Sequence, residues 1–237
     1  MSSFVLVHGA WGGAWIWRRV LNPLREAGHE VHAVTLTGDG ERAHLRHPGI
    51  TLRTHIDDVV GLVDAEELRN IVLVGHSYAG LLITGAADAL LARGAGHLKQ
   101  LVYVDAHAPL PGESWSSVHS PELVAQRLAA GAAHGGALPP PDPQVYGIDG
   151  ADRDWLLRRQ VPHPFNQYRE PLHFDAARLA SVARCYIACT QPAYPTLVVH
   201  HQRVRGWPGW QYLEMATGHC PMVSAPDALV QRLLALA

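Results

Sequence analysis

The fold of this chain is constrained most by residues 70–91, which read NIVLVGHSYAGLLITGAADALL. The β-branched and Leu run at 71–74 is typical of a buried parallel strand, and the Ala- and Leu-rich run at 81–91 has the length and composition of a helix. Ser77 lies at the Gly-punctuated turn between them. Strand, sharp turn, serine and helix form a nucleophile elbow, in which the serine hydroxyl stands clear of the sheet.

The residues that flank Ser77 are small, as such a tight turn requires. Gly75 lies two residues before Ser77, and Ala79 lies two residues after it, where the strict G-x-S-x-G pattern has glycine. The methyl group of Ala79 is a modest departure that the turn should tolerate. The helix that follows directs free N–H groups and the positive end of its dipole toward an anion formed at the serine. The stretch therefore predicts that Ser77 is a nucleophile in acyl transfer.

Length and composition favour one soluble domain. The 237 residues suffice for a single α/β domain with a large core, and 48% apolar with 17% charged residues is ordinary for a globular protein. A formal charge of -2 gives no electrostatic reason to expect nucleic acid. No apolar run approaches the roughly 20 residues of a membrane span, and no basic leader precedes the first strand. We expect a cytoplasmic protein without nucleic-acid or membrane partners; its oligomeric state stays open, a homodimer included.

The three cysteines do not indicate a disulfide scaffold or a zinc site. Cys185, Cys189 and Cys220 cannot all pair within one chain, and their spacing does not match a zinc-ligand pattern. We therefore expect reduced thiols.

Strands and helices alternate along the chain, which is the signature of a doubly wound, mostly parallel sheet. The predicted strands are residues 4–7, 31–36, 71–74, 98–105, 184–190 and 210–215, and the main predicted helices are residues 15–27, 51–68, 81–91 and 227–236. This regularity breaks after Ala108, where Pro-rich segments separate amphipathic pieces. A long insertion of this kind in an α/β enzyme is usually a functional lid. We expect one domain over residues 1–237 with a lid at about 108–183.

A serine hydroxyl is a weak nucleophile unless a base activates it, and His219 is the best candidate for that base. It follows the last predicted strand, beside Gly218, and it comes late in the chain as the order Ser, acid, His requires. The sequence holds 16 histidines. Most of the others, including the His200-His201 pair, are expected at surface or helix positions.

With these residues the chain resembles the α/β-hydrolase superfamily over essentially its whole length, and most closely its small esterase and hydroxynitrile-lyase branch. The matching residues are His8-Gly9, Gly13-Ala14-Trp15, Gly75-His76-Ser77-Tyr78-Ala79-Gly80 and Gly218-His219. The resemblance implies an α/β-hydrolase fold with a helical lid inserted after the strand that follows the elbow. It also implies an oxyanion hole formed by the backbone N–H groups of Ala10 and Tyr78.

The position of the acid departs from the closest branch. There the carboxylate follows the strand that matches residues 184–190, but this chain has Gln191-Pro192-Ala193 at that place. Asp105 ends the strand after the elbow and resembles the other acid position of the superfamily, used for example in some haloalkane dehalogenases. We therefore expect Asp105 to be the acid, with Glu214 on the last strand as its rival.

The sequence thus predicts a serine hydrolase that cleaves a carboxylic ester through an acyl-enzyme and requires no metal or organic cofactor. A lactone substrate stays open. The lyases of the resembling branch carry a Lys directly after the catalytic His and a Thr in the first loop, where this chain has Cys220 and Gly9. Lyase chemistry is therefore disfavoured. A non-catalytic receptor is disfavoured too, because it would have no need to keep a nucleophile, a base and an acid.

Aromatic residues near the elbow and in the insertion suggest an apolar pocket for an aryl or medium-chain ester. The alternative is that these rings only pack the lid against the core. The candidates are Trp11, Trp15, Trp115, Trp155 and Phe165, together with Tyr78 and Phe174.

Overall fold

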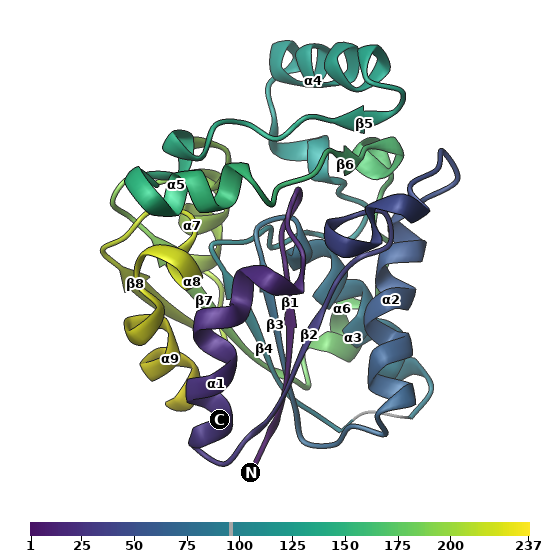
Figure 1. Cartoon of the computed structure of the whole chain (residues 1–237). Helices are drawn as coiled ribbons and strands as arrows, with labels where there is room; N and C mark the ends of the chain where they lie inside the picture. The colour runs from purple at the N-terminus through teal and green to yellow at the C-terminus, as the bar shows by residue number, and fades with distance from the viewer. Residues whose placement is uncertain (95–96) are drawn as a thin grey trace.

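Six parallel strands form one twisted sheet at the centre of the computed structural model, which describes residues 1–94 and 97–237 (Figure 1). The strands are β1 (Ser3–Val7), β2 (Glu30–Val34), β3 (Ile71–His76), β4 (Leu98–Val104), β7 (Ala183–Cys189) and β8 (Trp210–Met215). Their order is β2-β1-β3-β4-β7-β8, and every neighbouring pair is parallel. The predicted doubly wound parallel sheet is confirmed.

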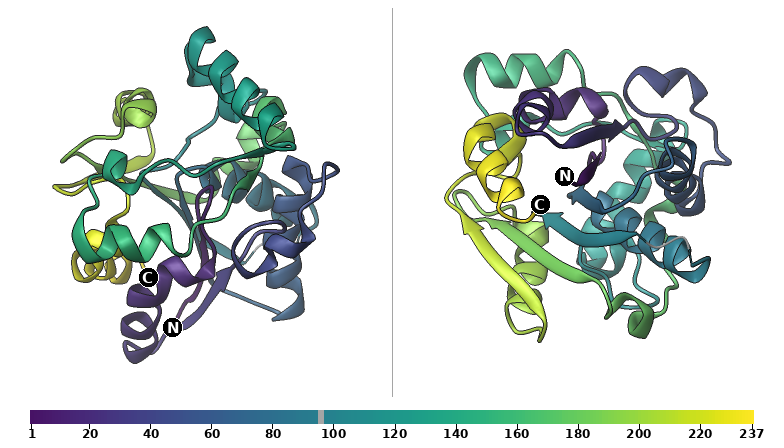
Figure 2. Two further views of the ribbon diagram at one scale, coloured as in Figure 1. Left: turned by 45° about the horizontal axis from the view of Figure 1, so that its top comes forward. Right: turned by 90° about the horizontal axis from the view of Figure 1, so that it is seen from below.

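Helices cover both faces of the sheet (Figures 1 and 2). On one face α1 (Arg18–Glu26) packs against α9 (Pro226–Leu234), and on the other α2 (Leu52–Ala65) packs against α3 (Ala79–Ala92). Because both faces are covered, every residue of β1 and β3 is buried, which explains their continuous apolar sequences. The sequence prediction missed α7 (Val198–Arg205), the helix that connects β7 to β8.

A long insertion, residues 105–182, separates β4 from β7. It contains α4 (Pro121–Ala133), α5 (Gly150–Leu157), α6 (Ala176–Leu179) and an antiparallel ribbon of β5 (Ala137–Leu138) and β6 (His163–Pro164). Figure 1 places α4, α5 and the ribbon beyond one end of the sheet, whereas α6 lies beside α3. The insertion thus adds a cap at the end of the sheet where the strands carry their carboxyl ends.

The remaining elements are short. They are α8 (Pro221–Ser224) and the 3-10 helices η1 (Ala14–Trp17), η2 (Gly40–Leu45), η3 (Trp115–Val118), η4 (Pro143–Tyr146), η5 (Asn166–Arg169) and η6 (Pro195–Leu197). The three cysteines are buried free thiols. Among the helices of the described residues, none is both long enough and apolar enough to cross a membrane.

Gly80 permits a close backbone approach that fixes the start of α3. A Cβ atom at this position would lie 1.9 Å from the carbonyl oxygen of His107, in the segment that follows β4. The same segment is bonded to the turn before α3, because the His107 N–H donates to the Ser77 carbonyl at 3.0 Å. The position of Ser77 therefore depends on backbone contact between two segments that are distant in sequence.

Gly80→Ala is expected to lower the free energy of unfolding by roughly 1 to 3 kcal/mol, because the backbone must move to admit the methyl group. Gly61→Ala is the matched control, since Gly61 lies within α2 and its added Cβ would meet no atom within 4 Å. That variant should be neutral or more stable by up to about 1 kcal/mol. Urea unfolding measures both; equal stability of the two variants would contradict the close approach.

Candidate active site

Ser77 lies between β3 and α3 in a strained backbone conformation. Its φ of 56° is in the left-handed region, which a non-glycine residue seldom adopts. The turn leaves no space for side chains nearby: an added Cβ at Gly75 would lie 2.8 Å from the Ala79 carbonyl oxygen, and one at Gly9 would lie 2.8 Å from the Cβ of Ser77. The Ser77 N–H donates to the Val104 carbonyl at 3.3 Å. Packing and hydrogen bonds on both sides therefore sustain the strain.

The structure brings Ser77, His219 and Asp105 into one hydrogen-bonded chain. The Ser77 Oγ atom lies 3.0 Å from Nε2 of His219, and Nδ1 of His219 lies 2.6 Å from Oδ2 of Asp105. Asp105 is fully buried and His219 is nearly so, whereas Ser77 is half-buried. A hydroxyl, an imidazole and a carboxylate in this order can activate the hydroxyl for attack on a carbonyl.

Glu214, the rival acid, lies elsewhere. It is on the exposed part of β8, where it forms an ion pair with Arg205. Its side chain is half exposed and has no contact with His219 among the described residues.

Asp105 follows β4 directly and is held by three donors. Besides His219, the Nε2 atom of His201 lies 2.6 Å from Oδ1, and the Cys189 N–H donates to Oδ1 at 3.0 Å. Burial acts to raise the pKa of Asp105, but the hydrogen bonds from His201 and His219 outweigh it and hold the pKa at about 2. Asp105 is therefore an ionised acceptor at neutral pH. His219 then carries its proton on Nδ1 and offers Nε2 to the Ser77 hydroxyl.

The histidine pair at 200–201 is not at the surface. The prediction of surface or helix positions is correct for the helix, since both residues belong to α7, but both side chains are buried. The Nε2 atom of His200 lies 3.1 Å from Nδ1 of His107, and His201 contacts Asp105. Their burial has a physical reason: a histidine can be buried when a polar partner meets it, and the partner of His201, Asp105, lies 96 residues away in the chain.

Three neighbours fix the ring and backbone of His219. Tyr194 stacks on its imidazole with ring centroids 4.5 Å apart, and the His219 N–H donates to the Tyr146 carbonyl at 3.2 Å. The Nε2 atom of His76 lies 2.8 Å from the His219 carbonyl oxygen. Burial, with a further effect of the nearby His219, lowers the pKa of His76 to about 3, so His76 is a neutral donor. Tyr146 and Tyr194 were not identified from the sequence.

A small cavity lies against Ser77. Its volume is about 20 Å³, close to the space of one water molecule. It is lined by Gly9, Ala10, Trp11, Gly12, Trp15, Ile16, His76, Ser77, Tyr146, Leu156, Gln160, His219 and Cys220. Of the five aromatic residues expected at a substrate pocket, Trp11 and Trp15 line this cavity.

The other three expected aromatic residues pack beside the cavity instead. The Trp155 ring meets Trp15 edge to face at 5.0 Å, and the Trp115 ring lies 5.0 Å from that of Tyr78. Phe165 stacks on Tyr168 at 4.3 Å. Trp155 and Trp115 thus pack the insertion against the core, which is the alternative that the sequence left open, whereas Phe165 packs within the insertion.

Ala10 and Tyr78 belong to two different segments beside Ser77. Ala10 follows the His8-Gly9 turn after β1 and lines the cavity, while Tyr78 follows Ser77 at the start of α3. Within residues 1–94 and 97–237, neither backbone N–H donates to another protein group. Both amides are thus free to bind an oxygen atom.

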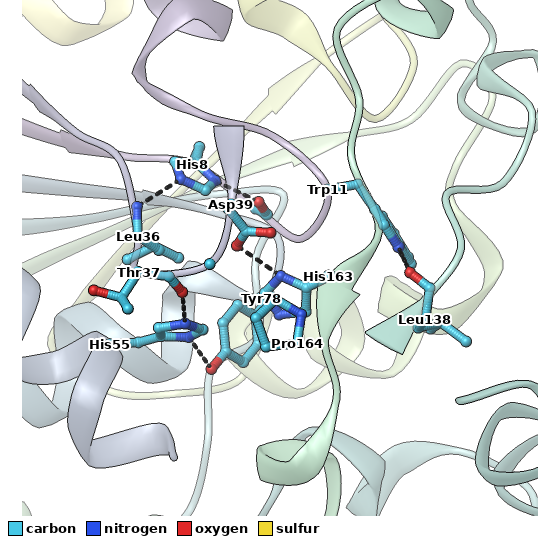
Figure 3. A network of polar contacts seen from close by, with 12 residues as sticks. His8, Trp11, Leu36, Thr37, Asp39, His55, Tyr78, Leu138, His163 and Pro164 are labelled. Atoms are coloured by element: carbon cyan, nitrogen blue, oxygen red, sulfur yellow. Dashed lines mark hydrogen bonds and ion pairs between the residues drawn. The ribbon is translucent and has the colours of Figure 1, made fainter. Parts of the chain in front are cut away.

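The Tyr78 side chain belongs to a buried polar network that joins the core to the insertion (Figure 3). Its hydroxyl lies 3.1 Å from Nδ1 of His55. In the same network, Nδ1 of His163 on β6 lies 2.7 Å from Oδ2 of Asp39, and both side chains are fully buried. Burial raises the pKa of Asp39 to about 7 and lowers that of His163 to about 3. Both shifts favour an uncharged pair that shares one proton.

The structure also bears on metal binding. The described part of the chain contains no group of three or more His, Cys, Asp or Glu side chains placed to hold a metal ion.

Comparisons with family models, protein sequences and solved structures agree on the class of protein. A family model described as "Alpha/beta hydrolase family" matches residues 4–232. The carbendazim hydrolyzing esterase of Nocardioides sp. (strain SG-4G) is 39% identical over 100% of both chains, and methylesterase 2 of Arabidopsis thaliana is 27% identical over 100% of this chain and 96% of its own. The structure of an extracellular alpha/beta-hydrolase from a Paenibacillus species superimposes with a TM-score of 0.83 at 21% identity, covering 100% of this chain and 99% of that one.

Asp39→Asn is expected to change how stability depends on pH. The folded pKa of Asp39, about 7, is above its ordinary value of 3.8, so between these values the folded state keeps a proton that the unfolded state releases. Asp39 therefore lowers the free energy of unfolding by up to about 4 kcal/mol as pH rises from about 4 to 7. Asparagine cannot lose that proton. The stability of the variant relative to the parent protein should rise over this range and level off above it.

Urea unfolding at a series of pH values measures this difference. Asp154→Asn, on the exposed side of α5, is the control and should run parallel to the parent protein. If Asp39→Asn also runs parallel, Asp39 is ionised throughout and the uncharged pair is wrong.

Proposed function

The chain belongs to the alpha/beta hydrolase family, and on this premise we propose that it hydrolyses carboxylic esters through a covalent acyl-enzyme formed on Ser77. The relatives described above are esterases, and the chain is a hydrolase that acts on esters. The observation that carries the finer proposal is the unbroken hydrogen-bond chain from the Ser77 hydroxyl through His219 to Asp105.

In the proposed first step the Ser77 Oγ atom attacks the ester carbonyl carbon while Nε2 of His219 takes the hydroxyl proton. The ionised carboxylate of Asp105 accepts the Nδ1–H of His219, which fixes the tautomer and stabilises the imidazolium that forms. The carbonyl oxygen gains negative charge and accepts hydrogen bonds from the backbone N–H groups of Ala10 and Tyr78. Each such donor contributes about 3 kcal/mol in comparable sites.

The second half of the reaction regenerates the serine. His219 gives its proton to the departing alkoxide, so the C–O bond breaks, the alcohol leaves and an ester of Ser77 remains. Water then attacks this ester while His219 takes a proton from the water. Collapse of the second tetrahedral intermediate releases the carboxylic acid and returns the proton to the Ser77 oxygen.

We propose that the insertion acts as a lid. The 20 Å³ cavity beside Ser77 is far smaller than the several hundred Å³ of a usual ligand pocket, so a substrate requires part of the wall to move. Trp11 connects that wall to the core. Its indole N–H donates to the Leu138 carbonyl at 2.8 Å, as Figure 3 shows, and its carbonyl accepts from the Val161 N–H at 3.2 Å. Release of these two contacts would widen the cavity toward β5 and β6.

The proposed substrate is an ester whose acyl part is apolar or aromatic. Trp11, Trp15, Ile16 and Leu156 form an apolar wall beside Ser77, which favours such a group. The name of one relative, methylesterase 2, supports a methyl ester as one case to test.

Hydroxynitrile-lyase chemistry has less support. Burial raises the pKa of the Cys220 thiol, so the residue after His219 is uncharged and cannot balance the charge of cyanide.

Ser77→Ala should abolish ester hydrolysis, with a loss in kcat of at least about 10⁴-fold. The assay is hydrolysis of p-nitrophenyl esters of rising chain length, with methyl esters and lactones of aromatic acids in parallel. Mass spectrometry of the parent protein after a short exposure to ester should show an acyl group on Ser77. Ser181→Ala, which changes an exposed serine before β7, is the control and should keep parental rates. Equal activity of Ser77→Ala and the parent protein would contradict the proposal.

A further inference from the structure

His201 meets Asp105 on the side opposite His219. Asp105 Oδ2 faces His219, whereas Oδ1 lies 2.6 Å from Nε2 of His201. Both contacts are equally short, and all three side chains are buried. Since Asp105 is ionised, Nε2 of His201 carries a proton and donates it to Oδ1. The carboxylate is thus held between two imidazoles, of which the proposed mechanism uses one.

His201 is well oriented for this contact by the packing of α7. Its ring meets the edge of Tyr186 on β7 with centroids 5.7 Å apart. The preceding residue has a separate function: Nδ1 of His200 accepts the Ala108 N–H at 3.4 Å, so its Nε2–H donates to His107. Adjacent histidines therefore bind different residues of the segment that follows β4, and of the two only His201 reaches the carboxylate.

No fixed cation shares the surroundings of Asp105 with the two imidazoles in the described part of the chain. The titratable groups around the carboxylate and His201, from β3, β7, α7, β8 and the segment after β8, are His76, Tyr186, Cys189, His200, Tyr212 and Cys220. Burial lowers the pKa values of the two histidines and raises those of the others, so all six are uncharged near neutral pH. Arg203, two residues after His201 on α7, is paired with Glu113 at 2.7 Å. The described residues therefore meet the charge of Asp105 with the N–H donors of His201, His219 and the Cys189 amide alone.

We propose that His201 is a positioning residue for the reaction, which holds Oδ1 of Asp105 so that Oδ2 stays aligned with Nδ1 of His219. The proposal rests on the relay described under the proposed function. A carboxylate can rotate about its Cβ–Cγ bond, and the Cys189 N–H alone would be a weaker restraint on Oδ1 than two donors. The position of the acid gives His201 this role, because Asp105 directly follows β4 and the helix after β7 supplies the second donor.

Loss of the His201 donor has a defined electrostatic consequence. Without the hydrogen bond to Oδ1, the carboxylate is less stabilised and attracts the proton of His219 more strongly. The acid limb of the kcat/KM profile should then move to higher pH. A residue that only fills space would not cause this shift.

The test compares His201→Phe, which keeps a ring but removes the donor, with His201→Gln, whose amide can place an N–H near the same point. His201→Phe should lower kcat roughly 10- to 100-fold, with KM changed by less than about threefold, and should move the acid limb upward. His201→Gln should recover most of kcat and the parental acid limb. Gln202→Ala, exposed on the same helix, is the control and should match the parent protein.

Two results would overturn the proposal. One is a His201→Phe protein with parental kcat and an unshifted acid limb; the other is a His201→Gln protein that is as impaired as His201→Phe, because then the N–H group is not what matters. Thermal unfolding shows whether each variant folds. If His201→Phe does not fold, kcat and the acid limb of His201→Gln decide, and impaired values overturn the proposal.

Proton NMR of the imidazole N–H signals tests the contact without any substrate. In the parent protein the Nδ1–H of His219 should give a downfield signal from its 2.6 Å bond to Asp105, and this signal should shift in His201→Phe and return in His201→Gln. If the parent protein hydrolyses no ester, the proposed function fails while this spectrum still decides the contact. An unchanged signal in His201→Phe would contradict the role of His201.

Discussion

A carboxylate buried at the end of a parallel strand requires donors on every side, and the arrangement around Asp105 follows from that requirement. Asp105 has no exposed surface, and a φ of 42° turns its backbone sharply at the end of β4. Its backbone N–H donates to the Ile187 carbonyl at 2.8 Å, while His219, His201 and the Cys189 N–H satisfy its side chain. Three separate segments, from β7, α7 and the loop after β8, thus converge on one charge.

The elbow at Ser77 could be predicted from sequence because its cause is local. A buried strand, small residues around a serine and a helix start all occur within a short stretch, and the structure places Ser77 in the strained turn that this pattern implies. Asp105 was identified differently, through a resemblance: it ends the predicted strand after the elbow, which is the other acid position of the resembling superfamily, and residues 191–193 offer no carboxylate where the closest branch has one.

Other parts of the site could not be predicted, because they depend on contacts between segments far apart in the chain. His201 differs in no local way from an exposed helical histidine; its burial depends on which face of α7 meets the end of β4. The same holds for Tyr146 and Tyr194, which surround His219 from the insertion and from the segment before α7. Aromatic composition suggested Trp11, Trp15, Trp115 and Phe165 alike; in the structure Trp11 and Trp15 line the small cavity beside Ser77, whereas Trp115 and Phe165 meet edge to face within the insertion.

The account depends on Asp105 as the acid of the relay, and kcat of Asp105→Asn on the best ester substrate tests this most directly. The asparagine keeps the size of the side chain but no longer holds the Nδ1–H tautomer of His219, so kcat should fall on the order of 10⁴-fold. Glu214→Gln, which changes the other strand carboxylate, should leave kcat near the parental value because Glu214 pairs with Arg205 at the surface. Near-parental turnover of Asp105→Asn, or a comparable loss in Glu214→Gln, would contradict the account.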